Sequence, residues 1–471
     1  MVNRVHSTSP PIEEPVRGAW SALIVTTLLF FLVVVDVSVV NVAFPSIGAD
    51  LGVSETSLSW IMSGYNVTIG ALLLASGRLA DSHGRKRMFI PGVGIFLIGS
   101  MLSAIAPTLG LLIVARVIQA VGGSIVAPTA LAVVLPDWPA HRRSMVIGLT
   151  GATGALGAVA GPALGSILID LYSWRAIFWI NVPICLLVLV LSPKLLRESK
   201  NPQATGRIDY VGVIIGTAAI AFIMLAIVES EQWGLTDVRV VALFIAGMGL
   251  VPVLLRRSAT HPEPLLELKL FSFRSFASTS MGVAFYSLAF TSGFLTNSLL
   301  LQQLWDIPIA EVGRALAVAP VLSAVVSPLS GRLADRIGHR WILAGGSLAL
   351  ALSYVLYALA LGEEPQVWTR FVPISVLGGL GVGATIATWA SAGLSDIPPS
   401  RFGTANATVR TVQQVCYALG ISILITILGS TGGSTNLGGY RWAWVYIAAM
   451  YTAAAITVAV TFPTGSSTDR A

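Results

Sequence analysis

Two residues whose types and placement could do chemistry are Asp36 and Arg116, because each interrupts a long apolar run. Ionising a carboxylate in a low dielectric is costly unless a cation is near, which suits a group that alternately holds a proton and a positive partner. At about 1.5 Å per residue, both lie roughly 9–12 Å below the outer ends of their runs. We therefore predict that Asp36 and Arg116 interact, directly or through water or Gln119, and that protonation of Asp36 weakens the contact. A permanently paired structural aspartate is the alternative.

A repeated basic loop supplies a second candidate site, with an expected role in conformational change. GRLADSHGRKR at 77–87 is matched by GRLADRIGHR at 331–340, an offset of 254 residues. Glycine permits a tight turn, the aspartate can sit at a helix end or pair with arginine, and the basic residues anchor the loop inside the cell. A merely positive loop is the alternative. The residues that we single out are Gly77, Asp81, Gly84, Arg85, Gly331 and Asp335.

The fifth apolar run, 144–169, is rich in glycine at helical spacing and contains one proline. Glycine on one helix face lets a neighbouring helix approach closely, and proline inside a span favours a bend that can serve gating. Ordinary glycine-mediated packing is the alternative. The predicted hinge residues are Gly148, Gly157, Gly161, Pro162 and Gly165.

Polar and aromatic residues within the apolar runs are candidates for lining a substrate cavity, since aromatic walls with few polar groups accommodate amphipathic ligands. For each of them, helix packing is an equally good explanation. The runs hold few acids, which favours neutral or singly charged cationic cargo over dications. The candidates are Asn41, Trp60, Tyr65, Asn66, Gln119, Tyr286, Asn297, Trp389, Gln413, Gln414 and Tyr417.

The elements that must position these residues are membrane-spanning helices. Of the 471 residues, 55% are hydrophobic and only 11% are charged, more apolar than a soluble domain. About 20 apolar residues span a bilayer as a helix, and an open sheet would leave unpaired backbone groups in lipid. The predicted spans are 19–44, 57–79, 88–107, 109–134, 144–169, 174–196, 209–229, 238–256, 275–301, 311–330, 341–361, 367–394, 404–428 and 441–462, fourteen in all.

Charge predicts the orientation of these spans. Alternate loops carry most of the Lys and Arg, and the intervening loops carry most of the acids. Because cytoplasmic loops are rich in Lys and Arg, both termini are predicted to be cytoplasmic. The net charge of +6 lies in these short clusters, so no basic domain for nucleic acid is expected.

The repeat divides the chain into two related halves, with substrate expected between them near the midplane. Six spans in each half leave two over, at 209–229 and 238–256. The predicted organisation is a cytoplasmic tail (1–18), a six-helix bundle (19–198), two extra helices with their flanking loops (199–274), a second six-helix bundle (275–462) and a cytoplasmic tail (463–471).

Five motifs resemble the major facilitator superfamily, over about 20–462. The 77–87 loop is similar to its signature loop, and ARVIQAVGG (115–123) to its span-four arginine motif. Three features resemble the fourteen-span drug:proton antiporter branch. They are the glycine spacing in span five, the segment VDVSVVNVAFP (35–45) and the segment WRAIFWINVP (174–183). The chain departs from those patterns at four positions, Ser38, Phe44, Ala120 and Ser166.

The resemblance implies a major facilitator fold, an all-α polytopic membrane protein of two six-helix bundles with two extra central helices. It implies a proton-coupled antiporter in the plasma (inner) membrane that exports small amphipathic compounds such as drugs. Its partners would be protons, the substrate and the lipid bilayer. We expect a monomer with no cofactor and no metal.

The sequence also bears on other classes of protein. An exporter of an endogenous metabolite or lipid on the same fold is the serious rival, and a receptor or structural membrane protein stays open. The longest loop between spans, 257–274, offers no catalytic constellation, no glycine motif would cradle a nucleotide phosphate, and no charge ring suits a channel. Cys185 and Cys416 lie in apolar runs and are expected to be packing residues.

Overall fold

A computed structural model describes residues 14–53, 55–139, 142–199, 209–234, 236–262, 264–398, 401–430 and 436–463, and all regular structure within these ranges is helical. Short 3₁₀ or π turns occur at Leu135–Asp137, Leu268–Ser272, Leu300–Leu304 and Val367–Phe371. The α-helices are α1 (Ala19–Leu51), α2 (Glu55–His83), α3 (Arg85–Ala104), α4 (Leu109–Val134), α5 (Arg143–Leu171), α6 (Ala176–Trp179), α7 (Asn181–Leu195), α8 (Tyr210–Trp233), α9 (Val238–Thr260), α10 (Arg274–Leu299), α11 (Ile309–Ile337), α12 (His339–Ala360), α13 (Val372–Leu394), α14 (Phe402–Ser430) and α15 (Leu437–Thr461).

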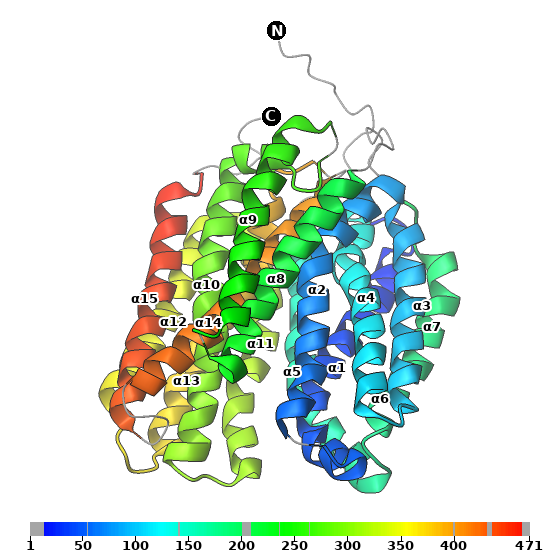
Figure 1. The fold of residues 1–471 in the computed structure, drawn as a ribbon. Coiled ribbons are helices and arrows are strands. Elements are labelled where there is room, and N and C mark those ends of the chain that lie inside the picture. Colours follow the sequence, from blue (N-terminus) through cyan, green and yellow to red (C-terminus); the bar gives the residue numbers. More distant parts are fainter. Residues whose placement is uncertain are drawn as a thin grey trace.

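The helices form two bundles that stand side by side (Figure 1). Helices α1 to α7 make the first bundle, in which α3 and α2 pack on α4 and α1 packs on α5. Helices α10 to α15 make the second, in which α11 packs on α13 and α12 on α15. The bundles meet where α5 packs on α11 and α13 and where α14 packs on α2 and α4. The largest apolar core is continuous across the two bundles and includes Ile147 of α5 and Ala387 of α13, while a smaller one lies within the first bundle.

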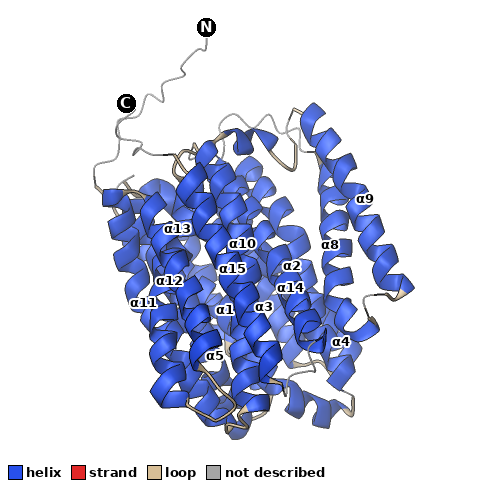
Figure 2. Cartoon of the chain, turned by 90° about the vertical axis from the view of Figure 1, so that its left-hand side faces the viewer, coloured by secondary structure: helices blue, strands red, loops and turns tan. Residues whose placement is uncertain are grey.

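Helices α8 and α9 stand as a pair at the edge of the molecule (Figures 1 and 2). They pack against each other, and α8 also contacts α2 of the first bundle and α14 of the second. The hydroxyls of Ser230 in α8 and Ser422 in α14 lie 3.1 Å apart. The pair therefore lies outside the joint between the bundles and touches both sides of it.

Several helices begin at side chains that cap them. Thr108 accepts a hydrogen bond from the backbone N–H of Leu111 at the start of α4, and Asp209 accepts one from Gly212 at the start of α8. Gly84 and Gly338, which correspond in the repeated loop, have φ angles of 117° and 88°, and each directly precedes a helix. This backbone region favours glycine, so the two copies of the repeat make the same kind of turn.

Among the described residues, twelve helices are long and apolar enough to cross a membrane, so the predicted count of fourteen spans is not confirmed. Helices α2 and α5 are absent from the twelve. Ser63, Tyr65 and Asn66 lower the hydropathy of α2 in its middle. In α5 the described residues contribute only a shorter apolar stretch, Met145–Gly154.

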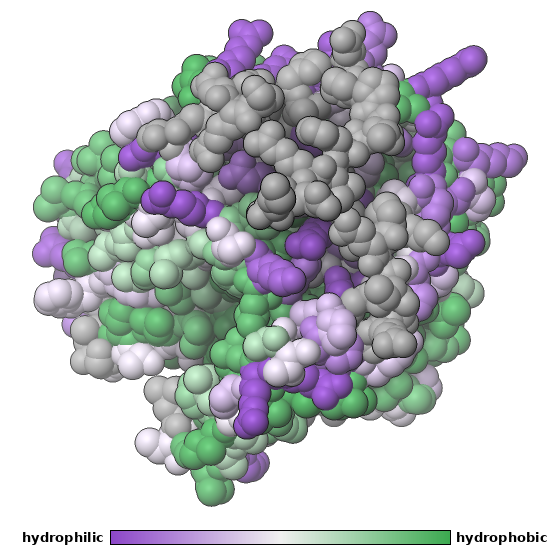
Figure 3. All heavy atoms as spheres, turned by 90° about the horizontal axis from the view of Figure 1, so that it is seen from above, coloured by the Kyte–Doolittle hydropathy of each residue, from purple (hydrophilic) through white to green (hydrophobic). Residues whose placement is uncertain are grey.

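The two ends of the molecule differ in charge. Helices α3, α5, α10 and α12 begin at Arg85, Arg143, Arg274 and His339 at one end, which we call the basic end. The same end holds the beginning of α1 and the end of α15 (Figure 1). Seen from this side, hydrophilic residues spread over the face with hydrophobic surface between them (Figure 3). The structure thus gathers the basic loops that alternate along the sequence.

Candidate functional site

A cluster of buried polar side chains lies inside the first bundle, around Asp36. Both Asp36 and Arg116 are 0% exposed. Nη1 of Arg116 donates to Oδ2 of Asp36 over 2.6 Å. The side-chain amides of Gln119 and Asn181 donate to the other carboxylate oxygen, Oδ1, over 2.8 Å and 2.9 Å. The carboxylate is therefore held by three donors from α4 and α7, with Arg116 as its counter-ion.

Aromatic rings and a second hydrogen-bonded shell enclose this cluster. The guanidinium carbon of Arg116 lies 4.0 Å from the centroid of the Tyr65 ring and 5.6 Å from that of Phe178, within reach of cation–π attraction. Asn181 also donates to the hydroxyl of Ser100, which in turn donates to the carbonyl of Phe178. Breaking a buried, enclosed ion pair of this kind costs about 3–5 kcal/mol, because one uncompensated charge is left behind.

A cavity of about 620 Å³ lies between the two bundles. Its walls are mostly apolar and aromatic, with a few amides and hydroxyls. Val33, Val34 and Val37 of α1 line it, whereas Asp36 does not. Helix α1 therefore separates the charge cluster from the cavity and contacts both. The polar and aromatic lining residues are Phe30, Ser38, Asn66, Thr150, Phe290, Phe294, Asn297, Ser323, Ser353, Tyr354, Tyr357, Phe371, Ser375, Asn406, Arg410, Gln413, Gln414, Tyr417 and Tyr451.

The structure brings five of the predicted cavity residues to this lining: Asn66, Asn297, Gln413, Gln414 and Tyr417. Three others in the first bundle lie elsewhere. Tyr65 lies against Arg116, Gln119 bonds to Asp36, and the ring of Trp60 lies 6.3 Å from that of Trp233 in α8. Trp60 is used in helix packing, and Tyr65 and Gln119 belong to the charge cluster. The prediction that these three residues line the cavity was therefore wrong.

Two predicted residues of the second bundle, Tyr286 and Trp389, also lie outside the lining. Their ring centroids are 5.9 Å apart, and Tyr286 lies 5.4 Å from Tyr451, which does line the cavity. They form the buried support of that wall. The side chain of the remaining candidate, Asn41, lies outside the described residues.

The structure adds residues of the cavity lining and of the charge cluster that the sequence analysis missed. Arg410 lies in the apolar run 404–428, as Asp36 lies in 19–44, but other polar residues flank it. Asn181 lies in the quoted motif 174–183 but was not singled out. Tyr354 and Tyr357 in α12 carry no signal that distinguishes them from core tyrosines. Only the fold shows which way such side chains face.

The first copy of the repeated loop joins the two bundles at the basic end. Asp81 of α2 accepts hydrogen bonds from Nε and Nη2 of Arg85 over 2.9 Å and 2.8 Å. Its other oxygen accepts from the backbone N–H of Thr404 over 2.6 Å and from the Thr404 hydroxyl over 2.9 Å, in the first turn of α14. A carboxylate at a helix N-terminus is stabilised by the helix dipole. Asp81 therefore links a basic loop of one bundle to a helix of the other.

Glycines allow this close approach. A Cβ atom on Gly77 would collide with the Cβ of Ala407 and lie 2.8 Å from the carbonyl oxygen of Gly403. Gly84 faces the carboxylate of Glu198, which accepts the backbone N–H groups of Lys86 and Arg87 at the start of α3. Both positions require glycine.

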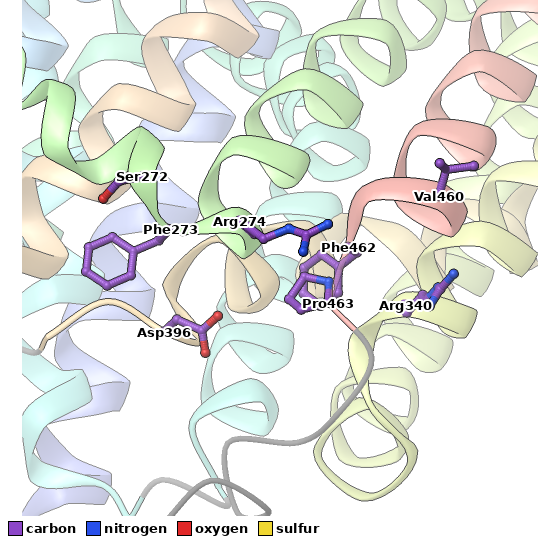
Figure 4. Close-up of a pocket in the computed structure, with 8 residues that line it drawn as sticks. All are labelled: Ser272, Phe273, Arg274, Arg340, Asp396, Val460, Phe462 and Pro463. Carbon is purple, nitrogen blue, oxygen red and sulfur yellow. The ribbon is translucent and has the colours of Figure 1, made fainter.

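In the second copy of the loop, Gly331 is buried, while the side chain of Asp335 lies outside the described residues. Arg340 donates to the carbonyl of Ala459 in α15, within its own bundle. A second pocket, of about 600 Å³, opens beside this contact, with Arg274, Arg340 and Asp396 around it (Figure 4). None of the predicted site residues is among the described residues that line it.

The glycines of α5 face two different partners. A Cβ on Gly157 would lie 2.9 Å from the carbonyl oxygen of Phe31 in α1, one on Gly161 would collide with the hydroxyl of Ser38, and one on Gly165 would lie 2.6 Å from Val39. Gly148 faces the backbone of Ser327 in α11, across the joint between the bundles. The Pro162 side chain lies outside the described residues. Helix α5 thus packs closely on the helix that carries Asp36.

Comparison with known proteins agrees with this architecture. A family model described as Major Facilitator Superfamily matches residues 26–209 and 270–470. The chain is 32% identical over 438 residues to the puromycin resistance protein pur8 of Streptomyces alboniger, covering 92% of this chain and 86% of that protein. It is 30% identical over 405 residues to the riboflavin transporter RibZ of Clostridioides difficile, covering 86% and 87%.

A third relative, the multidrug resistance protein Stp of Mycobacterium tuberculosis, is 30% identical over 412 residues, covering 87% of this chain and 75% of that protein. Among solved structures, a double tryptophan mutant of XylE has a TM-score of 0.71 at 13% identity, covering 96% of this chain and 97% of that chain. The human organic anion transporter MFSD10 has a TM-score of 0.66 at 15% identity, covering 93% and 99%. With a family model matched over most of its length, this chain belongs to the Major Facilitator Superfamily of membrane transporters.

Proposed function

We propose that the protein is a proton-coupled antiporter that exports small amphipathic compounds across the plasma membrane by alternating access. The observation that carries this proposal is the buried Asp36–Arg116 pair, which lies behind the α1 wall of the cavity. Protonation of Asp36 would remove the counter-ion of Arg116 and leave a buried charge unpaired. That state is relieved only if α1 or α4 moves, and a movement of α1 changes the cavity.

The contacts between the bundles support alternating access. Asp81 with Thr404, Gly77 with Ala407 and Gly148 with Ser327 all join the bundles in the half of the molecule nearer the basic end. We infer that the basic end is cytoplasmic and that these contacts close the cavity toward the cytoplasm. An exporter would alternate between this arrangement and one in which they separate.

The proposal includes fourteen spans, with α2 and α5 crossing the membrane beside the other twelve. Each is 29 residues long, about 43 Å at the usual rise per residue, and each packs along helices that meet the criteria for a span. The family model matches on either side of a gap, 210–269, that contains α8 and α9. This gap is consistent with two helices added to a twelve-helix fold. Both termini would then be cytoplasmic.

A metabolite exporter on the same fold is the second candidate. The observation that favours it is the similarity to a riboflavin transporter, at 30% identity. The aromatic cavity suits a flat ring system of that kind as well as a drug. Both candidates share the mechanism above and differ only in cargo.

Flux into proteoliposomes under an imposed pH gradient tests the mechanism. We expect gradient-driven uptake of an amphipathic dye by the wild-type chain. Asp36→Asn should abolish the dependence on the gradient, because an amide cannot bind and release a proton, while the dye still binds. Asp170→Asn is the matched control, since Asp170 is exposed at the far end of α5. Gradient-driven uptake by Asp36→Asn would contradict the role of Asp36.

No uptake of any amphipathic compound by the wild-type chain would instead favour a receptor or a structural protein. Competition by riboflavin and by puromycin in the same vesicles compares the two cargo classes. Preferential competition by riboflavin would support the metabolite exporter.

A further inference from the structure

One charged side chain lines the cavity among the described residues, and it is Arg410 of α14. Its guanidinium carbon lies 5.3 Å from the centroid of the Phe30 ring in α1, on the opposite bundle. Within the described part of the chain, Arg410 makes no hydrogen bond or ion pair, and its Nε atom is buried without a partner. A guanidinium carries five N–H donors and no acceptor, so most of its bonding capacity stays open.

This setting differs from that of Arg116, the other arginine near the middle of the molecule. Arg116 has Asp36 as counter-ion, with the bond at 2.6 Å. The described lining of the cavity contains no Asp or Glu that could do the same for Arg410. A partly buried cation without a counter-ion is costly, and a bound anion would offset that cost.

The surroundings of Arg410 fit an anionic group attached to a ring system. Gln413 and Gln414 follow on the same helix and line the cavity, so their amides lie within one turn of the guanidinium. Phe30, Tyr417 and Tyr451 supply aromatic surface in the same lining. At about 620 Å³ the cavity is within the range that holds drug-sized ligands, roughly 300–1,000 Å³.

We propose that the cavity binds small amphipathic anions, such as aromatic carboxylates or sulfonates, with the acidic group on Arg410 and the rings among the aromatic side chains. This inference rests on the proposed transport function and specifies its cargo. It departs from the expectation of neutral or singly charged cationic cargo, because a cation would meet Arg410 without an acid to balance it. Arg410 would be a binding residue, and Asp36 would remain the proton site.

Two xanthene dyes of similar size test the proposal, the anionic fluorescein and the cationic rhodamine 123. Equilibrium binding to the purified full-length chain is measured for each. We expect the wild-type chain to bind fluorescein at least tenfold more tightly than rhodamine 123. Tighter binding of rhodamine 123, or equal binding of the two, would overturn the inference whatever the variants do.

The variants locate the preference. Arg410→Gln should weaken fluorescein binding about tenfold or more and leave rhodamine 123 unchanged or tighter, whereas Arg410→Lys should keep most of the preference. Arg441→Gln is the control, since Arg441 is exposed and is not among the lining residues. If Arg410 only holds the bundles together through Phe30, Arg410→Gln will lower the melting temperature without changing the ratio of the two affinities. That result would overturn the binding role.

Binding and flux together separate this inference from the proposed function. Fluorescein preference without gradient-driven uptake would contradict the antiporter and leave the anion site standing. Gradient-driven uptake that favours rhodamine 123 would support the antiporter and contradict the anion site. Should Arg410→Gln fail to fold, the wild-type chain is compared with Arg410→Lys instead. The preference for fluorescein must survive in Arg410→Lys, because this change keeps the charge, and its loss would contradict the proposed role of that charge.

Discussion

Asp36 shows how far single residues can be interpreted from sequence. The depth of Asp36 and of Arg116 in the membrane follows from where their apolar runs end. Opposite charges at equal depth in a low dielectric attract each other strongly. The structure places them 2.6 Å apart. The contribution of Asn181 could not be predicted in the same way. Its amide reaches Asp36 because α6 and α7 meet at that level, and their boundary is set by tertiary packing.

Arg410 was missed although it meets the criterion that identified Asp36. It follows Asn406 and precedes two glutamines, so the stretch is polar for several residues and no single charge stands out. Whether such an arginine faces lipid, a neighbour or a cavity depends on the rotation of α14, which its sequence leaves open. The location of Phe30 opposite it is a property of both bundles together.

At the end of the molecule opposite the basic end, which we call the acidic end, Asp50 offers a prediction about pH. It lies beyond the apolar stretch Ala19–Val40 and accepts hydrogen bonds from Arg175 over 2.7 Å and Trp174 over 3.0 Å. The Arg175 bond, and next the Trp174 bond, hold the pKa of Asp50 below its ordinary value. A lowered pKa in the folded state stabilises the fold above the unfolded pKa of about 3.9, and this stabilisation is lost as pH falls through the folded pKa.

We therefore expect Asp50→Asn to lower the melting temperature of the purified chain by a constant amount between about pH 8 and pH 5, with the difference shrinking below about pH 4. Thermal unfolding in detergent across this range measures it. Because Asp50 is partly exposed, the effect is small. A difference that stays constant down to pH 3.5 would mean that packing, not charge, accounts for it.

Helix α5 shows what can be predicted at the scale of an element. Glycines at helical spacing predict that a neighbour comes close, because a missing Cβ is useful only where another backbone approaches. The partner cannot be predicted this way. Gly157, Gly161 and Gly165 turn out to face α1, whereas Gly148 faces α11 of the other bundle. One helix therefore packs within its bundle at one end and across the joint at the other.

This arrangement leads to a prediction for Gly161. Gly161→Val adds an isopropyl group whose Cβ atom alone would collide with the Ser38 hydroxyl, so α1 and α5 must separate. We expect a loss of about 1–3 kcal/mol of stability, typical of overpacking, and a loss of most transport. Melting temperature and dye flux in proteoliposomes measure the two effects.

Gly94→Val is the matched control, since a Cβ on Gly94 in α3 meets nothing within 4 Å. Because valine has a somewhat better helix propensity than glycine, it should leave stability equal or slightly raised and flux close to wild type. Equal effects of the two substitutions would show that the α1–α5 contact has no special part in transport.

For the whole molecule, the repeat at an offset of 254 residues predicts two related halves, and the structure has two bundles with one copy of the loop in each. Gly84 and Gly338 both have positive φ angles directly before the helices that follow the two copies of the loop. The basic residue two positions further on also behaves alike in the two copies. Nζ of Lys86 donates to the carbonyl of Pro193 in α7, and Arg340 donates to the carbonyl of Ala459 in α15, each within its own bundle. The contact of Asp81 with α14 of the other bundle could not be predicted from the repeat, because it depends on how the two bundles meet.

The number of spans is the property of the whole molecule that most needs a direct test. If α2 and α5 both cross the membrane, the two ends of each helix lie on opposite sides. We expect single cysteines at His83 and Arg142, in a background of Cys185→Ser and Cys416→Ser, to be shielded from a membrane-impermeant maleimide in intact cells.

Cysteines at Val53 and Tyr172, beyond the other ends of α2 and α5, should react with the same reagent in those cells. His83, Arg142 and Tyr172 are exposed, so access and not burial decides the outcome at these positions. A cysteine at Glu363, between α12 and α13 at the acidic end, is the reference for the outer side, and permeabilised cells show that every thiol can react. If His83 and Val53 react alike in intact cells, α2 does not cross, and the same comparison of Arg142 with Tyr172 decides α5. If α2 or α5 does not cross the membrane, every loop after it lies on the opposite side from the one predicted. The basic end could then not be wholly cytoplasmic. This labelling therefore tests the number of spans and their orientation together.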